Sequence, residues 1–213
     1  MAARYMISLD LKNKKCLVVG GGKVAERKAR SLLECGALVY VVSPEAVPAL
    51  SSMAAEGLLI HRRGYYKSSD LEDVFLVIGA TGREEVNRQI ADDCAGRNLI
   101  VNIVDDPAKC NFYVPATVRR GSLAIAVSTG GKSPLLARKI REELELLYGP
   151  QYEDFLEMLG SLREEIIKNV PDPEKKKKKL EGLVSDEILS ILKKGRLEPA
   201  KEMLLSAYHG SGS

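Results

Sequence analysis

Tryptophan is absent from this chain of 213 residues, and histidine, phenylalanine and cysteine are scarce. The two histidines, His61 and His209, lie far apart in the sequence, which argues against a histidine-based metal site. The four cysteines form no CxxC pair, so the sequence indicates neither a zinc site nor a disulfide framework. We therefore expect no metal ion held by the protein itself.

Long apolar runs are also missing. No run approaches the ~20 residues that cross a bilayer, and the first fifteen residues contain no apolar core of signal-peptide length. A net charge of +3 is too small to indicate a nucleic-acid partner. With 45% apolar and 29% charged residues, the composition predicts an ordinary cytoplasmic protein with neither a membrane nor a nucleic acid as partner.

Short apolar runs and helical patterns alternate through the first hundred residues. The patterns predict helices directly after the glycines at 20–22, at 47–56 and at 84–97, and strands at 16–19, 38–42, 58–60, 74–79 and 99–104. Strands and helices that alternate at this spacing form a parallel, doubly wound sheet, which binds ligands at the carboxyl ends of its strands. The predicted fold class is therefore α/β.

The pattern changes beyond Asp106. Two strands, 112–118 and 123–128, are expected on either side of a tight turn at 119–122, and a helix capped by Ser133 follows. From residue 152 the chain is predicted to be helical, with 171–182 as a linker or a helix start. The predicted parts are a Rossmann-like domain at 1–111, a central hairpin and helix at 112–150, a helical domain at 151–208 and a flexible tail at 209–213.

A glycine turn separates the first strand from the first helix. The segment GGGKVA, residues 20–25, fits the G-x-G-x-x-A pattern of dinucleotide-binding proteins. Gly20 permits the tight turn, and Gly22 lets the backbone approach a pyrophosphate. Lys23 and Val24 open the helix whose N-terminus faces that anion. We expect a dinucleotide to bind here; a purely structural turn is the alternative.

The acid expected ~20 residues after the glycine turn is not squarely present. Ser43, Pro44 and Glu45 follow the second strand, and either the serine or the glutamate could hold the adenosine ribose. An arginine that could bind a 2′-phosphate is missing from this segment, so NAD is favoured over NADP. Thr81, in the segment GATG after the fourth strand, is the polar group beside the expected nicotinamide.

Two carboxylates and an amide gather at the end of the fifth predicted strand, in LIVNIVDDP, residues 99–107. A solvated turn is one interpretation, because Asp-Asp-Pro is good turn chemistry and Pro107 cannot continue a central strand. A general base beside a bound nicotinamide is the other interpretation.

Two long motifs, SLDLKNKKCLVVGGGKVAERKARSLLECGA and VNIVDDPAKCNFYVPATVRRGSLAIAVSTGGKSPLLARKIREELE, follow each other in the chain. Together they resemble the precorrin-2 dehydrogenase and sirohydrochlorin ferrochelatase family, the NAD-dependent module of siroheme synthase, over residues 6–170. The resemblance implies oxidation of precorrin-2 to sirohydrochlorin with NAD⁺, followed in some members by insertion of Fe²⁺ to give sirohaem. It also implies a homodimer in which the central region packs against that of its partner.

The resemblance assigns catalysis to the aspartate that follows an asparagine and two apolar residues, which is Asp105 here. Dehydrogenating a reduced tetrapyrrole removes a hydride and a proton, and a carboxylate at the strand end can take the proton. Asp106 is expected to cap the turn instead. Asn102 is either a hydrogen-bond donor to substrate or cofactor, or a structural amide.

Further candidates for binding the substrate, a tetrapyrrole with eight carboxylates, are Arg119, Arg120, Ser128, Thr129 and Lys132. The basic side chains could pair with the carboxylates or be solvated surface charges. The STGGKSP turn at 128–134 could hold a carboxylate at a helix N-terminus or be a simple strand-to-helix turn. The alternative functions are a non-catalytic NAD-sensing module and a dehydrogenase of another small molecule.

Overall fold

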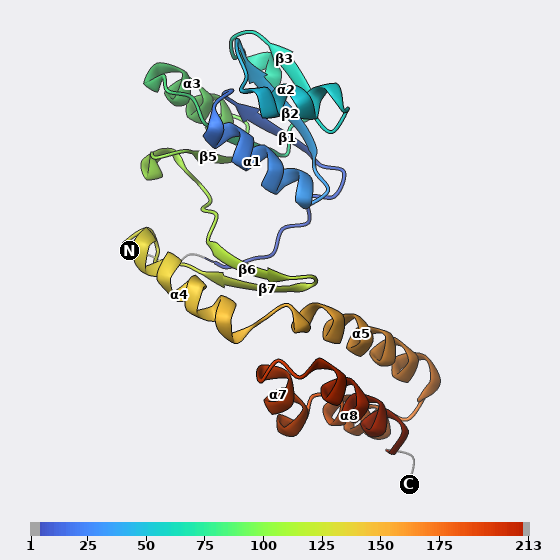
Figure 1. Ribbon diagram of the computed structural model, residues 1–213. Coiled ribbons are helices and arrows are strands. Elements are labelled where there is room, and N and C mark those ends of the chain that lie inside the picture. The colour runs from blue at the N-terminus through green and yellow to red at the C-terminus, as the bar shows by residue number, and fades with distance from the viewer. Residues whose placement is uncertain (1–4, 211–213) are drawn as a thin grey trace. The chain divides into compact units, whose positions relative to one another are not determined.

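The computed structural model of the chain describes residues 5–210, which divide between Val114 and Pro115 into two units. The first unit contains a parallel sheet of five strands in the order β3-β2-β1-β4-β5 (Figure 1). The strands are β1 (Lys15–Val19), β2 (Leu38–Ser43), β3 (Ile60–Arg63), β4 (Leu76–Gly79) and β5 (Ile100–Ile103). The helices are α1 (Lys23–Glu34), α2 (Pro48–Ala55) and α3 (Glu84–Ala95), with 3₁₀ turns η1 (Ser68–Leu71) and η2 (Pro107–Lys109). The predicted α/β class and parallel sheet are confirmed.

Both faces of this sheet are covered by helices. Successive residues of a strand point to opposite faces, so Val18 packs with Ala25 of α1 while Leu17 belongs to the core that contains Ile90 of α3. The two cores are continuous with apolar residues of the neighbouring strands. Because all five strands are parallel, their carboxyl ends lie at the same end of the sheet, and the loops after β1, β2, β4 and β5 lie there too.

The third strand begins at Ile60, two residues later than predicted. The preceding residues close helix α2 instead of extending the strand. Gly57 has a φ of 76°, and the N–H of Leu58 donates to the carbonyl of Met53 at 2.9 Å. This is the Schellman arrangement, in which a glycine in the left-handed region ends a helix.

The second unit begins with an antiparallel hairpin and continues as helices (Figure 1). Its elements are β6 (Ala116–Arg120), β7 (Leu123–Val127), α4 (Pro134–Leu147), α5 (Gln151–Asn169), α6 (Pro173–Gly182), α7 (Asp186–Lys193) and α8 (Leu197–Gly210). Phe155 of α5, Ile188 of α7 and Leu204 of α8 belong to one buried core. Ser133 caps α4 as predicted, because its hydroxyl accepts a hydrogen bond from the N–H of Leu136 at 3.2 Å.

Two boundaries in the second unit differ from the prediction. The hairpin turn is Gly121-Ser122, so Arg119 and Arg120 lie inside β6; Gly121, with a φ of 53°, suits the first position of a two-residue turn. Residues 112–115 are not a strand, which is consistent with Pro115 lacking an N–H. Of the two alternatives predicted for 171–182, a linker or a helix start, the structure has the helix: the lysine run belongs to α6, which starts at Pro173.

The end of the chain is more ordered than the sequence suggested. Residues 209 and 210, predicted as part of a flexible tail, belong to α8, and the tail residues 211–213 lie outside the described residues. Among residues 5–210, no helix combines the length and the apolar character that crossing a membrane requires. The division of the second unit at residue 150 stays a prediction.

Candidate functional site

The glycine turn lies where the loops after β1, β2 and β4 meet. Gly20 has a φ of 131°, and a Cβ atom there would lie 2.8 Å from the carbonyl carbon of Ala80. At Gly21 a Cβ atom would lie 2.7 Å from the Ser43 hydroxyl oxygen and 2.9 Å from the carbonyl carbon of Glu45. Both positions therefore require glycine, Gly21 because of contacts that the sequence pattern does not reveal.

Gly22 differs from its two neighbours, because a Cβ atom on it would meet nothing within 4 Å. It is the N-cap residue of α1 and supplies no side-chain hydrogen bond to the first turn. The N–H groups of that turn are thus left to a ligand, and the positive end of the helix dipole favours an anion. This open, uncapped helix start fits the pyrophosphate of a dinucleotide.

A cavity of about 510 Å³ opens beside the glycine turn. It is lined by six of the predicted cofactor residues, namely Gly20, Gly22, Ser43, Pro44, Glu45 and Thr81. Lys23 and Val24, which were also predicted to bind the cofactor, lie at the start of α1 and do not line this cavity. The lining also includes Tyr65 and Arg83, which sequence reasoning missed.

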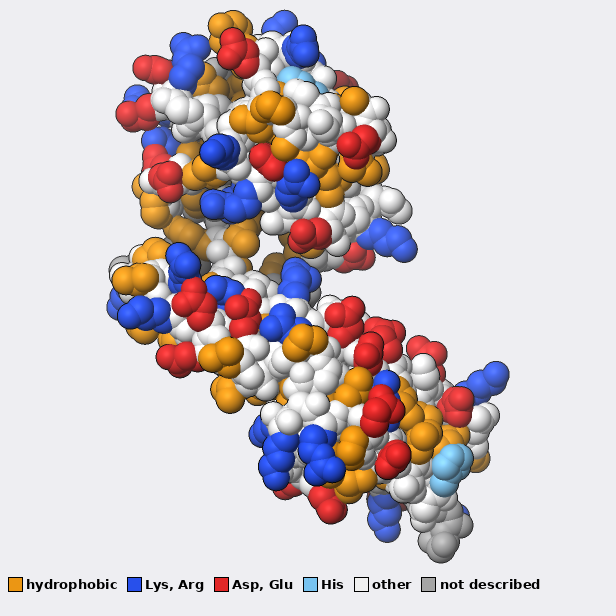
Figure 2. All heavy atoms as spheres, in the orientation of Figure 1, with side chains coloured by type: hydrophobic (Ala, Val, Ile, Leu, Met, Phe, Trp, Pro, Cys, Tyr) orange, Lys and Arg blue, Asp and Glu red, His pale blue; other side chains and the backbone are white. Residues whose placement is uncertain are grey.

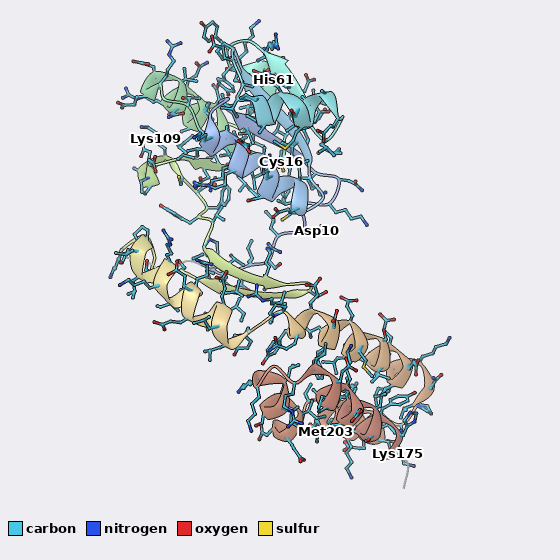
Figure 3. All side chains as sticks on the ribbon, viewed as in Figure 1. Asp10, Cys16, His61, Lys109, Lys175 and Met203 are labelled. Atoms are coloured by element: carbon cyan, nitrogen blue, oxygen red, sulfur yellow. The ribbon has the colours of Figure 1, made fainter. Side chains whose placement is uncertain are left out.

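Of the two candidates for the ribose, Ser43 is already engaged. The residue is only 3% exposed, and its hydroxyl lies 3.0 Å from Nε2 of His61 on the neighbouring strand β3. His61 is labelled in Figure 3. The carbonyl of Ser43 accepts a hydrogen bond from the N–H of Gly64 at 3.1 Å. Glu45 is exposed at the cavity, which leaves its carboxylate available for ribose hydroxyls.

Thr81 is also used within the protein. Its hydroxyl donates to Oδ1 of Asn87 at 2.7 Å and accepts from the N–H of Arg83 at 3.2 Å. The side-chain amide of Asn87 donates in turn to the carbonyl of Thr81 at 3.1 Å. These bonds fix the loop between β4 and α3, so a nicotinamide would meet a rigid backbone there rather than a free hydroxyl.

The two carboxylates after β5 have different surroundings. Asp106 is the N-cap residue of η2 and forms an ion pair with Lys109, which is labelled in Figure 3. The hydrogen bond from Lys109 lowers the pKa of the Asp106 carboxyl. Asp105 is exposed, and no described residue forms a hydrogen bond or an ion pair with its carboxylate. Its backbone φ of 62° lies in the left-handed region, which residues other than glycine seldom adopt. The carboxylate available for chemistry at this strand end is therefore that of Asp105.

The side-chain nitrogen of Asn102 is used within the protein, at the end of β5, and is not free to donate to a ligand. This atom, Nδ2, donates to the carbonyl of Phe112 at 3.1 Å. Asn111 acts in a similar way along β5, accepting from the N–H of Val101 at 2.7 Å and donating to the carbonyl of Leu99 at 2.7 Å. The side chain of Asn111 thus replaces a missing neighbour at the edge of the sheet.

Lys28 of α1 is a charged group of this region that the sequence reading did not select. Burial lowers the pKa of its amine, and the charge of Asp105 is among those that oppose this shift. Among residues 5–210, no carboxylate lies within ion-pair distance of Lys28. No group of three or more histidine, cysteine or acidic side chains is placed to hold a metal ion in the same part of the chain.

The predicted substrate-binding residues of the second unit have mixed surroundings. The guanidinium of Arg120 donates to the carbonyls of Tyr148 at 2.9 Å and Glu145 at 3.3 Å, so it caps the end of α4. The hydroxyl of Thr129 donates to the carbonyl of Ser133 and accepts from the N–H of Ser133. The exposed side chains of this set are Arg119, Ser128 and Lys132.

Comparison with known proteins agrees with this arrangement. A family model described as putative NAD(P)-binding matches residues 7–116, and one described as sirohaem biosynthesis protein central matches residues 120–146. The solved structure of SirC, a precorrin-2 dehydrogenase, superimposes with a TM-score of 0.77 at 29% identity, covering 93% of this chain and 100% of SirC.

Siroheme synthases are similar in sequence. The protein of Methylobacillus flagellatus is 35% identical over 97% of this chain and 44% of its own length, and that of Chromobacterium violaceum is 38% identical over 87% and 40%. The chain thus spans less than half the length of these curated relatives. It belongs to the siroheme synthase and precorrin-2 dehydrogenase family of NAD(P)-binding proteins, the family that its two sequence motifs resemble.

Proposed function

We propose that this chain oxidises precorrin-2 to sirohydrochlorin with NAD⁺ during sirohaem synthesis. The observation that carries the proposal is that one edge of one sheet holds both an uncapped glycine turn and the uncommitted carboxylate of Asp105. The likeness to SirC over 93% of the chain supports the choice of substrate. Siroheme synthase relatives support the place of the reaction in sirohaem synthesis.

Each half of the reaction has residues suited to it. When bound, NAD⁺ accepts the hydride that leaves the macrocycle. Asp105 accepts the proton, because its carboxylate is exposed and is not paired as Asp106 is with Lys109. The backbone of Gly22 and the first turn of α1 hold the pyrophosphate and so orient the cofactor toward β4 and β5.

The choice of NAD over NADP is part of the proposal. Glu45 places a carboxylate at the cavity, where it would bind the ribose hydroxyls and repel a 2′-phosphate. Arg63, which pairs with Ser43 in the sheet, is an exposed cation that would attract a 2′-phosphate and so favour NADP. Comparing the Kd values of NAD⁺ and NADP⁺ for the wild type and Glu45→Gln tests the balance; a wild type that prefers NADP⁺ would contradict the proposal.

The tetrapyrrole carboxylates are proposed to bind the exposed groups of the second unit, Arg119, Ser128 and Lys132. A guanidinium, an ammonium and a hydroxyl are the donors that carboxylates favour. Arg120 and Thr129 have a smaller part in this proposal, because their polar atoms already bond to the backbone.

The decisive assay adds purified protein to precorrin-2 and NAD⁺ without oxygen and follows both the sirohydrochlorin chromophore and NADH. Formation of both in equal amounts supports the proposal. NAD⁺ binding without turnover would instead indicate an NAD-sensing module, and oxidation of a different small molecule would indicate another dehydrogenase.

Insertion of Fe²⁺ into sirohydrochlorin is a separate question. A chelatase need not hold the metal with its own ligands, because the four pyrrole nitrogens are the final ligands. The reaction does require a base for the pyrrole N–H protons, and Asp105 is the candidate for that role as well. Sirohydrochlorin with Fe²⁺ or Co²⁺ under anaerobic conditions tests it; a rate equal to the protein-free control restricts the chain to oxidation.

We also propose a homodimer formed through the central region. Among residues 5–210, the second sheet consists of β6 and β7 alone, so each strand has an unpaired edge that a second copy of the chain can cover. Helix α4 carries exposed leucines at its two ends, including Leu135 at 65% and Leu146 at 87% exposure, and Figure 2 shows apolar side chains among charged ones over α4. Sedimentation of the wild type and Leu146→Glu tests this.

The four free thiols fit a reducing compartment, which supports the proposed cytoplasmic location.

A further inference from the structure

The loop after β3 presents an aromatic ring to the cavity from a fixed backbone. The carbonyl of Tyr65 accepts a hydrogen bond from Nη2 of Arg62 at 2.9 Å, and Arg62 also pairs with Asp70. The next residue, Tyr66, is buried and its hydroxyl donates to Oδ2 of Asp93 at 2.9 Å. Tyr65 itself is 66% exposed and lines the cavity. The Tyr65 ring therefore lies beside the cavity without being part of the buried core, so packing of the core does not explain its position.

Arg83 approaches the same ring from another loop, the one after β4. It is the N-cap residue of α3, after β4, and its guanidinium carbon lies 5.9 Å from the centre of the Tyr65 ring. The strand order places β2 and β1 between β3 and β4. The contact between Tyr65 and Arg83 therefore joins the loops after β3 and β4, whose strands have β2 and β1 between them.

We propose that Tyr65 and Arg83 form the wall that binds the adenine ring of the dinucleotide. This inference rests on the proposed NAD site. If the pyrophosphate lies at Gly22 and the nicotinamide extends toward Asp105 beyond β4, the adenosine half extends the other way, toward Glu45 and β3. Tyr65, after β3, lines the cavity on that side with an exposed ring, and the guanidinium of Arg83 lies beside this ring.

The chemistry of the wall suits a purine. Aromatic rings and guanidinium groups both stack on the face of a base, and such stacking does not depend on a hydrogen-bond pattern. Val86 adds an apolar contact at the same cavity. The carbonyl of Tyr65 is already held by Arg62, so a ligand that orders the ring does not also have to order this part of the loop.

Calorimetry with fragments of the cofactor tests the wall separately from the chemistry. We expect Tyr65→Ala to weaken binding of AMP, ADP-ribose and NAD⁺ by about 5- to 100-fold, the range for loss of one base stack. Nicotinamide mononucleotide should bind as before, because it lacks the adenine. Tyr65→Phe should retain the affinity for AMP, because stacking needs the ring and not the hydroxyl.

The arginine has a matched control on the same helix. Arg83→Met should weaken AMP by about 2- to 5-fold, as for an exposed cation–π contact. Arg88→Met should not change it, because Arg88 is exposed and pairs with Glu84 outside the cavity. Circular dichroism melting of each variant verifies the fold.

The inference fails if Tyr65→Ala, still folded, binds AMP and ADP-ribose as tightly as the wild type. It fails as well if the wild type binds neither fragment. A wild type that binds NAD⁺ through Tyr65 but does not oxidise precorrin-2 overturns the proposed function and leaves the adenine wall in place.

Discussion

Replacing Gly21 by alanine is the substitution whose effect follows most directly from the structure. The added methyl group would lie 2.7 Å from the Ser43 hydroxyl oxygen and 2.9 Å from the carbonyl carbon of Glu45, where ordinary contact begins at 3.4 Å. The Ser43 hydroxyl cannot turn away without losing its bond to His61, and the Glu45 carbonyl is backbone. The loops after β1 and β2 must therefore move apart.

The cost should be that of an overpacked site, about 1–3 kcal/mol, which for a chain of this length lowers the Tm by about 2 to 12 °C. Affinity for NAD⁺ should fall as well, because the same movement shifts Gly22 and Glu45 relative to each other. Thermal melting gives the first quantity and calorimetry the second.

Gly22→Ala is the matched control, because a Cβ atom at Gly22 meets nothing within 4 Å. It should leave the Tm nearly unchanged, whereas Gly22→Asp should abolish NAD⁺ binding in a folded protein by repelling the pyrophosphate. If Gly21→Ala melts and binds NAD⁺ like the wild type, the close approach of the two loops is wrong.

Three further predictions concern polar contacts elsewhere, two in the first unit and one in the second. In the wild type, the stability contributed by Asp106 should be present above the ordinary carboxyl pKa of ~3.9 and be lost as pH falls below it, because Lys109 lowers the pKa of Asp106; Asp106→Asn should remove this loss in acid melting curves. Burial and Asp93 raise the pKa of Tyr66, so its contribution should be present below pH ~10 and be lost above it; Tyr66→Phe should cost about 1–3 kcal/mol in urea unfolding at pH 8 and flatten the alkaline loss. Arg120→Met should destabilise the second unit by a similar 1–3 kcal/mol, measured by urea unfolding, without changing NAD⁺ affinity.

Local patterns were enough to predict the scaffold. The apolar run before Gly20, the glycine turn and the amphipathic α1 each depend on residues within a few positions of one another, and the structure has them where the sequence placed them. The two strand-end aspartates were assigned differently: the family resemblance pointed to Asp105 as the base, and turn chemistry favoured Asp106 as the cap. The misplaced start of β3 came from treating Leu58 as a strand residue when it closes a helix.

Contacts between neighbouring strands and loops were not predictable in the same way. The bond from Ser43 to His61 depends on β3 lying next to β2, and the pairing of Tyr65 with Arg83 depends on two loops 18 residues apart in the sequence. Neither contact leaves a local pattern. The engagement of Arg120 by the end of α4 is similar, because a basic residue in a hairpin reads as solvated until the helix is placed beside it.

Asp105 gives a test in which backbone and side-chain effects can be separated. Its φ of 62° is strained for a side chain, by about 1–2 kcal/mol, whereas glycine adopts this region freely. Asp105→Gly should therefore keep or raise the free energy of unfolding, while Asp105→Ala should lower or keep it. Both variants lose the carboxylate, so both should lose dehydrogenation by about 10²- to 10⁴-fold with NAD⁺ affinity retained. The same anaerobic assay and calorimetry measure these quantities. If Asp105→Gly is active and stable while Asp106→Asn is inactive, the base is Asp106, and the left-handed backbone at Asp105 serves only to turn the chain.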